Sequence, residues 1–294
     1  MTEQSEADAA TSVFVGHREL LFSVVYNLLG SVADTEDVLQ ETWVSWSRRQ
    51  AQPSPVENPR AYLVRIAVNE ALARQASITR RRESYVGPWL PEPVLTESSE
   101  SEEDPAVRSE SVSMALLVVL ETLTPLERAV FVLNEVFGYA HTEIAEILER
   151  SPSAVRQLAH RARSHVHARR PRYQADPQVQ RQVTERFVSA AFGGDLAALM
   201  EILAPDVTMW TDSGSKGLRP IQGRSNVVRL IANVTAKLPS DLAVRYRTVN
   251  GDPSAVIFSD DSPYAVMVLD VDPEDDRVHG IYGVTNPDKL SGMG

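Results

Sequence analysis

The sequence predicts a multidomain protein in which two all-α helical domains precede an α+β domain, with helices covering a curved antiparallel sheet. Three observations lead to this fold class. Apolar residues recur at helical spacing through residues 14–72 and again through 114–166. Proline, serine and acidic residues separate these two stretches between 85 and 110. Alternating or apolar β-rich runs begin only at Val207. We therefore expect four segments: 1–84, 85–112, 113–172 and 173–294.

Composition excludes several classes of protein. The 294 residues suffice for two or three domains, and a hydrophobic fraction of 43% is enough for packed cores. The absence of cysteine excludes disulfides, thiolate zinc sites and cysteine nucleophiles. The sequence has no apolar run long enough to span a bilayer, and its start, MTEQSEADAA, is acidic and polar. We expect a cytoplasmic protein with no membrane partner, no metal and no cofactor.

The first helical domain is expected to hold three helices. Gly30 should end the first helix, and Asp34 can cap the second. The second helix, DTEDVLQETWVSWSRR, is acidic at its start and basic at its end, which complements the helix dipole. A proline-rich loop, RQAQPSPVENPR, leads into a long third helix that ends in three arginines.

The linker, YVGPWLPEPVLTESSESEED, cannot bury a core of its own. It nevertheless contains Trp89 and Leu90, which are unusual residues for an extended linker. We expect both side chains to dock on a neighbouring surface.

The second helical domain contains a helix-turn-helix pattern in Gly138–Arg172. The helix before it should begin with a capping box formed by Thr124 and Glu127. Ser151 is placed to cap the second helix of the motif, with Pro152 at its first position. One face of that helix is apolar, and the other carries Arg156, Gln157, His160, Arg161 and Arg163.

The basic face of this helix favours DNA binding over a merely solvated surface. Between Ser151 and Ala175 there is no acidic residue, although the whole chain has a formal net charge of -11. Arginines suit phosphates and guanine edges, and the second helix of such a motif normally enters the major groove.

The last segment should form an α+β layer structure. We expect helices at 178–192, 196–203 and 225–237, and strands at 207–210, 242–249, 255–259, 264–271 and 278–285. Acid/base chemistry could be imagined for six residues, which are Asp206, Trp210, Asp212, Tyr264, His279 and Tyr282. They show no paired set at convincing spacing, so we expect no catalytic residue and no enzyme.

The first two domains resemble an extracytoplasmic-function (ECF) sigma factor of bacterial RNA polymerase. DTEDVLQETWVSW is similar to the family's helix that binds the polymerase clamp helices, and NPRAYLVRIAVNEAL is similar to its promoter-melting helix. LTPLERAVFVLNEVFGYAHTEIAEILERSPSAVRQLAHRAR is similar to the helix-turn-helix domain that reads the −35 element. The resemblance implies core RNA polymerase, through its clamp helices and flap, and promoter DNA as partners.

The resemblance also implies site residues. Polymerase contacts would fall on Asp34, Asp37, Gln40, Glu41 and Trp43. Contacts to the −10 element would fall on Asn58, Arg60, Tyr62, Arg65 and Asn69. The basic helix of the second domain would read the −35 element. For Trp43, Trp46 and Tyr62, packing in the core is the alternative.

The third domain resembles a SnoaL-like domain of the nuclear-transport-factor and ketosteroid-isomerase superfamily, through GDLAALMEILAPDVTMWTDSG. YVGPWLPEP in the linker and NPDKL near the C-terminus are typical of the ECF subgroup that carries this extension, the SigJ type. A DGGGK-like motif of that subgroup reads DSGSK here, from Asp212 to Lys216, and has lost two glycines. The resemblance implies that this domain regulates the sigma domains through residues Trp89, Leu90, Pro91, Asp212, Gly214 and Lys216.

A second function class stays open. The chain could be a SnoaL-like enzyme or a sensor of an unknown small ligand in its C-terminal domain, carrying the helix-turn-helix as a DNA-binding arm. Co-purification with core polymerase would favour the sigma factor, whereas DNA binding without polymerase would favour the alternative.

Overall fold

The computed structural model describes residues 2–52, 54, 56–83, 85, 87–96, 112–168, 175–214, 219–239 and 241–294, without the side chains of residues 2–8 and 83. The chain divides into two compact units. The helical unit contains the described residues of 2–83 and 119–168. The C-terminal unit contains those of 85–96, 112–118 and 175–294. Most of the described linker and the start of the helix after it therefore pack with the C-terminal part of the chain.

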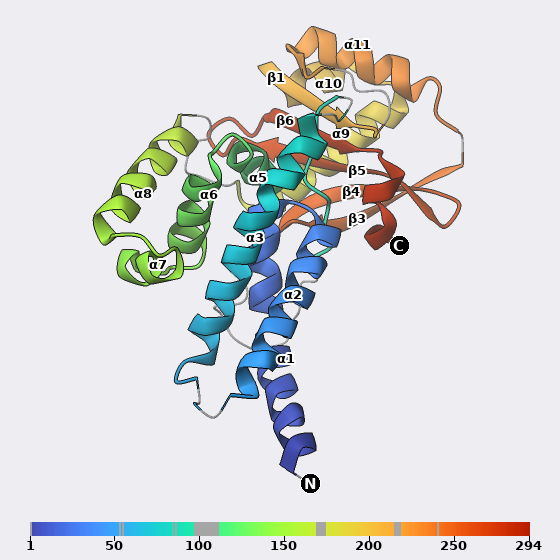
Figure 1. Cartoon of the computed structure of the whole chain (residues 1–294). Coiled ribbons are helices and arrows are strands. Elements are labelled where there is room, and N and C mark those ends of the chain that lie inside the picture. Colours follow the sequence, from blue (N-terminus) through green and yellow to red (C-terminus); the bar gives the residue numbers. More distant parts are fainter. Residues whose placement is uncertain are drawn as a thin grey trace. The chain divides into compact units, whose positions relative to one another are not determined.

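The elements of the helical unit follow the predicted order (Figure 1). They are α1 (Thr2–Leu29), α2 (Val32–Gln50), α3 (Pro59–Glu83), α6 (Pro125–Phe131), a π-helical turn η1 (Val132–Val136), α7 (His141–Ile147) and α8 (Pro152–His167). The short helix α5 (Met114–Leu120) precedes α6, and its first residues belong to the C-terminal unit.

The turn between α1 and α2 confirms one predicted cap and corrects the other. Gly30 has φ +69° and its N–H donates to the carbonyl of Tyr26 at 2.7 Å, so it ends α1 as predicted. The cap of α2 is Ser31, whose hydroxyl accepts from the N–H of Asp34 at 3.3 Å. The prediction that Asp34 caps this helix is wrong, because Ser31 caps it first and the helix begins three residues earlier than expected.

The three long helices pack on one another around a buried tryptophan. Trp46 is 1% exposed, and its indole N–H donates to the carbonyl of Ala10 at 2.9 Å. Trp43 is only partly buried, with its ring edge-on to Phe14 at a centroid distance of 5.3 Å. Trp46 is therefore a core residue, and Trp43 is placed at the edge of the bundle.

The helix-turn-helix has the caps that the sequence predicts. Thr124 and Glu127 form the reciprocal capping box at the start of α6. Gly138 has φ +69° before α7, and Ser151 accepts from the N–H of Ala154 at 3.2 Å to cap α8. These bonds fix where each helix begins, and thereby which residues of α8 face outward.

Replacing Thr124 with alanine should destabilise the chain by about 1 kcal/mol, since a threonine N-cap contributes about 0.5–2 kcal/mol. The shift should appear in urea unfolding followed by circular dichroism. Thr142→Ala on α7, where Thr142 is exposed, is the matched control and should shift stability by less than about 0.5 kcal/mol. Equal shifts in the two variants would contradict a capping role.

The C-terminal unit is a six-stranded sheet with three helices. Its helices are α9 (Pro177–Gly193), α10 (Leu196–Ile202) and α11 (Arg224–Thr235). Its strands are β1 (Leu203–Asp212), β2 (Ile221–Gln222), β3 (Leu242–Val249), β4 (Asp252–Ser259), β5 (Ser262–Val271) and β6 (Val278–Val284), in the order β2-β1-β6-β5-β4-β3. Two short 3-10 turns, Pro287–Lys289 and Ser291–Met293, follow β6.

One strand pairing differs from the expected antiparallel sheet. β1 runs parallel to β6, with Trp210 opposite Tyr282, while the other described pairings are antiparallel. The long connection between β1 and β6, through the rest of the sheet, allows the parallel pair. The very short strand β2 was not predicted.

Both faces of this sheet are covered by apolar side chains. The helices α9, α10 and α11 cover one face, with core residues such as Phe187 of α9 and Val227 of α11. The other face, which includes Phe258 and Val268, is covered by Leu90 of the linker, by the start of α5 and by the last 3-10 turns. The linker and the start of α5 thus complete the core of the C-terminal unit.

No helix in the described ranges combines the length and the apolar character needed to cross a membrane.

Candidate DNA-binding and linker-binding sites

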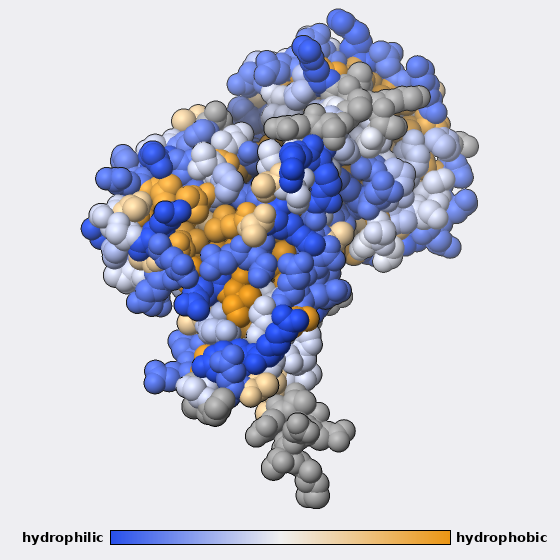
Figure 2. All heavy atoms as spheres, in the orientation of Figure 1, coloured by the Kyte–Doolittle hydropathy of each residue, from blue (hydrophilic) through white to orange (hydrophobic). Residues whose placement is uncertain are grey.

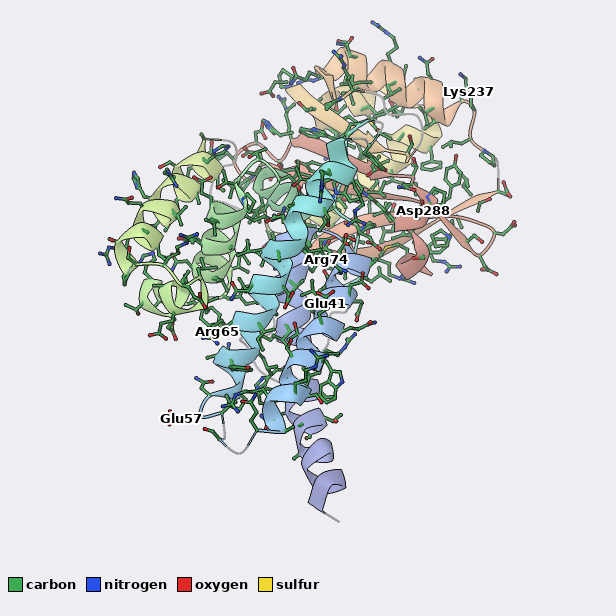
Figure 3. All side chains as sticks on the ribbon, in the orientation of Figure 1. Glu41, Glu57, Arg65, Arg74, Lys237 and Asp288 are labelled. Carbon is green, nitrogen blue, oxygen red and sulfur yellow. The ribbon has the colours of Figure 1, made fainter. Side chains whose placement is uncertain are left out.

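The predicted polymerase-contact residues lie along α2, but not all of them are accessible. Asp37, Gln40 and Glu41 are exposed. Asp37 and Glu41 lie 2.9 and 3.6 Å from the guanidinium of Arg74 on α3, and Figure 3 shows Glu41 and Arg74 on neighbouring helices. Asp34 instead is buried, and its carboxylate lies 2.6 Å from Arg81. The exposed acidic surface is therefore formed by Asp37 and Glu41, with Gln40 beside them, and the side chain of Asp34 connects α2 to the end of α3.

The predicted −10 residues lie at and after the start of α3. The side chain of Asn58 accepts from the N–H of Ala61 at 3.1 Å, which caps the helix. The ring of Tyr62 packs on that of Trp46 at 6.0 Å, and the guanidinium of Arg65 lies 5.7 Å from the Tyr62 ring centroid. An aromatic ring beside an arginine can stack on and hold an unpaired base.

Two further −10 residues complete this face. Arg60 is exposed on the first turn of α3. Asn69, two turns beyond Tyr62, donates from its side-chain amide to the carbonyl of Ile147 on α7 at 3.2 Å. The far end of the face is therefore already engaged within the helical unit.

The predicted −35 residues share the outer face of α8, opposite its buried residues Val155, Leu158, Ala159, Ala162 and Val166. Arg156, Gln157 and His160 are exposed, and Figure 2 shows hydrophilic residues along the outside of α8. Arg161 lies 3.1 Å from Glu127, and Arg163 lies 3.2 Å from Glu135. The side chains of Arg161 and Arg163 are 65% and 39% exposed, and ion pairs of exposed arginines contribute little, so phosphate groups can compete for both.

The linker is held in the C-terminal unit by two buried residues of opposite charge. The Asp212 side chain, at the end of β1, is fully buried and accepts from the N–H of Leu90 at 3.0 Å and from the hydroxyl of Tyr85. The Lys289 ammonium donates to Asp212 at 2.7 Å and to the carbonyl of Leu90 at 2.5 Å. We call Asp212 and Lys289 the linker clamp, because together they bind both backbone groups of Leu90.

Two linker aromatics enclose the ammonium group of the clamp. The Lys289 nitrogen lies 3.3 Å from the centroid of the Trp89 ring and 5.4 Å from that of Tyr85. The two rings meet edge-to-face at 5.0 Å, and Asn286 donates to the Tyr85 hydroxyl at 2.9 Å. Burial first, and then the hydrogen bond to Asp212, raise the pKa of Tyr85 above its usual range, so the phenol stays protonated and donates.

The loop after Asp212 keeps a glycine at position 214, where the geometry requires one. Gly214 has φ +76°, and a β-carbon there would lie 2.8 Å from the side chain of Asn286. Ser213, which replaces a glycine of the motif, does not need a positive φ. Lys216, the last predicted residue of the motif, lies outside the described residues.

The linker also extends the edge of the sheet. Leu95 pairs with Val249, and the N–H of Thr96 donates to the carbonyl of Thr248 at 2.9 Å. The N–H of Asn250 donates to the carbonyl of Val94 at 2.9 Å. These bonds place the linker beside β3, the last strand of the sheet.

The sequence predicted that Trp89 and Leu90 would dock, and it marked Asp212, but it missed the other half of the clamp. Lys289 lies in the NPDKL motif, and its 6% exposed side chain completes the site. Tyr85 and Asn286 were missed too. A signal for these residues was present in the sequence, because YVGPWLPEP, DSGSK and NPDKL are typical of the same subgroup and all three contribute to this site.

The imagined acid/base residues do not form one site, although His279 lies 3.7 Å from the carboxylate of Asp206. The side chain of Asp206 is 82% exposed, and Tyr264 is 41% exposed. Trp210 and Tyr282 stack on each other at 5.0 Å, and Asp212 belongs to the clamp. The residues that the structure describes contain no group of histidine and carboxylate side chains suited to a metal ion.

Comparisons with known proteins agree with this geometry. Residues 13–81 match the family model described as Sigma-70 region 2, and residues 113–166 match Sigma-70, region 4. The chain is 35% identical over 295 residues to a Mycobacterium tuberculosis protein named ECF RNA polymerase sigma factor SigJ, covering 96% of this chain and 93% of that protein. It is 30% identical to a protein of the same species named Probable ECF RNA polymerase sigma factor SigI, covering 97% and 96%. The crystal structure of the M. tuberculosis sigma factor SigJ is similar with a TM-score of 0.74 and 32% sequence identity, over 96% of this chain and 98% of that one.

Proposed function

The chain belongs to the extracytoplasmic-function RNA polymerase sigma factors, and from this premise we propose how its parts act. The exposed acidic surface of α2 binds core polymerase. The face of α3 around Tyr62 and Arg65 contacts the −10 element, and the outer face of α8 contacts the −35 element. Each assignment is supported by exposed charged side chains on the helix concerned, such as Glu41 on α2, Arg65 on α3 and Arg156 on α8.

We further propose that the C-terminal unit regulates this activity in cis by holding the linker. The observation that carries the proposal is the linker clamp, in which Asp212 and Lys289 bind both backbone groups of Leu90. A linker that joins two sigma domains has to follow the polymerase cleft when the factor engages polymerase, as the family resemblance implies. A linker bound beside β3 and in the clamp is not available for that path.

The energetics suit a switch rather than a permanent tether. A buried ion pair contributes little net stability, because desolvation of the two charges offsets much of their attraction. The clamp is therefore specific, while a partner that offers the linker a comparable surface can displace it.

We regard the chain as a transcription factor of the cytoplasm and not as an enzyme. The exposure of Asp206 and Tyr264, and the use of Asp212 in the clamp, support this choice. A small ligand in the C-terminal unit is not needed for the proposed regulation.

Transcription in vitro tests the basic function. Mixed with core polymerase from the source bacterium and a pool of sheared genomic DNA, the chain should co-purify with the polymerase and yield discrete start sites. Core polymerase alone is the control and should yield none of these start sites. Sequence-specific DNA binding without polymerase, and no discrete transcripts with it, would instead favour the ligand-sensor alternative.

A further inference from the structure

One end of the −10 face of α3 contacts a helix of the helix-turn-helix. The side-chain amide of Asn69 donates to the carbonyl of Ile147 at the end of α7, at 3.2 Å. Ile147 is buried, with 5% of its surface exposed, while Asn69 is an exposed residue. A residue predicted to contact the −10 element is thus bound to the domain that reads the −35 element.

Nearer the start of α3, the same two helices enclose a cavity of about 320 Å³. One wall contains Asn58, Tyr62 and Arg65 of the −10 face, and Figure 3 shows Arg65 on the side of α3 that faces α7. The opposite wall contains Glu143 and Glu146 of α7. Two carboxylates therefore face the surface that an unpaired DNA strand, itself negatively charged, would occupy.

The position of Glu143 is fixed by the fold. Its carboxylate accepts from the N–H of Ala140 at 2.7 Å, at the start of α7. The negative charge therefore belongs to the ordered end of the helix and does not depend on a freely rotating side chain.

A largely buried cluster of three charged residues, Arg82, Glu121 and Arg128, connects the end of α3 to α6. Glu121, just before α6, accepts from Arg82 at the end of α3 and from Arg128 on α6, the latter at 2.6 Å. Arg128 also donates to the carbonyl of Asn27 at 2.8 Å, and Arg82 donates to that of Leu29 at 2.5 Å, both at the end of α1. The side chains of Arg82, Glu121 and Arg128 are 17%, 19% and 2% exposed.

This cluster holds two cations on one carboxylate in a poorly hydrated site. Burial lowers the pKa of the Arg128 guanidinium to about 9, and both arginines remain charged at neutral pH. Losing this carboxylate would leave two largely buried guanidinium groups without the anion that they share, which is unfavourable for the packed arrangement. Glu121 is thus the residue on which the arrangement depends most.

We propose that the helical unit is a closed state in which Glu143 and Glu146 of α7 face the −10 residues of α3 across the cavity and stand in for the negative charge of DNA, with α7 held there by Arg82, Glu121 and Arg128. The proposal rests on the proposed function, since it assigns promoter contacts to α3. The outer face of α8, with Arg156 and Gln157, stays exposed in the closed state. A closed chain is therefore competent to contact −35 duplex but not a melted −10 strand, and it must open before promoter melting.

Site-specific crosslinking tests this proposal in the full-length chain. The protein has no cysteine, so Ala61→Cys with Glu146→Cys places the only two thiols on opposite walls of the cavity. Neither position is a predicted DNA contact. After treatment with a short bismaleimide, the crosslinked chain should support at least ten-fold less transcription from the genomic pool than the same variant left uncrosslinked.

Two controls separate the possible failures. The single variants A61C and E146C cannot form the crosslink, so each should transcribe equally well with and without the reagent. Equal transcription by crosslinked and uncrosslinked protein would overturn the closed state and leave the proposed function intact. Inactive uncrosslinked protein together with inactive wild-type chain would overturn the proposed function itself.

A second variant tests the cluster from the opposite direction. Glu121→Gln should allow α7 to move away from α3 and should increase transcription several-fold at limiting core polymerase, with no crosslinker present. Glu121→Asp keeps the carboxylate and should transcribe at the wild-type level. Circular dichroism should show that the helical content is retained. A folded Glu121→Gln chain that transcribes no more than wild type would count against the proposal.

Discussion

Replacing Asp212 with alanine should release the linker and raise promoter-directed transcription several-fold at limiting core polymerase. The substitution removes the acceptor for the N–H of Leu90 and leaves the Lys289 ammonium buried without its carboxylate. Breaking one side of a buried ion pair costs about 3–5 kcal/mol, which the chain avoids by letting the linker and Lys289 reach water. Run-off transcription measures the gain, and limited proteolysis between Tyr85 and Thr96 measures the release.

Two further variants serve as comparisons, one in the same strand, β1, and one at Lys289, the partner of Asp212. Asp206→Ala makes the identical change at the other end of β1, where the carboxylate is exposed, and should leave both readouts unchanged. Lys289→Met removes the charge that Asp212 neutralises, and should release the linker in the same way. A released linker without any change in transcription would contradict regulation in cis, and a linker that stays protected would contradict the clamp.

Replacing Arg156 and Arg161 together with alanine should abolish most promoter-directed transcription. Each arginine–DNA contact is worth about 1–3 kcal/mol, so the pair should lower activity by at least about 30-fold. The slope of log affinity against log salt should fall by about 1 for each phosphate group that the variant no longer binds. The measurement is binding of the holoenzyme to promoter DNA over a series of salt concentrations.

Arg181→Ala is the matched control for the salt series. Arg181 is an exposed arginine on α9, paired with Glu185 at 3.0 Å, and it lies outside the predicted DNA-binding helix. It should leave both the affinity and the salt slope unchanged. If the double variant on α8 behaved like this control, the −35 assignment would be wrong.

Sequence predicts best what is encoded within a few residues. The capping box of Thr124 and Glu127 and the cap at Ser151 involve residues three apart, and the structure confirms both. The start of α2 was missed because Ser31 and Asp34 are both good caps, and local preference alone does not choose between them.

Long-range pairing could not be read from local pattern. Lys289 lies 77 residues from Asp212 and 199 from Leu90, and only the folded sheet brings them together. The parallel pairing of β1 with β6 is likewise a property of the whole sheet. One clue was present in β4, where Ala255–Phe258 is a continuous apolar run. Such runs indicate a strand buried on both faces, so a segment other than the three helices had to cover the second face.

Hydrogen exchange at the linker, in the free chain and in the complex with core polymerase, tests the central claim most directly. In the free chain the N–H of Leu90 donates to Asp212 and that of Thr96 to Thr248, so the peptide containing them should exchange slowly. On binding core polymerase this peptide should exchange markedly faster, because the linker leaves the clamp and the edge of β3. Protection that is equal in the free chain and in the polymerase complex would contradict the account.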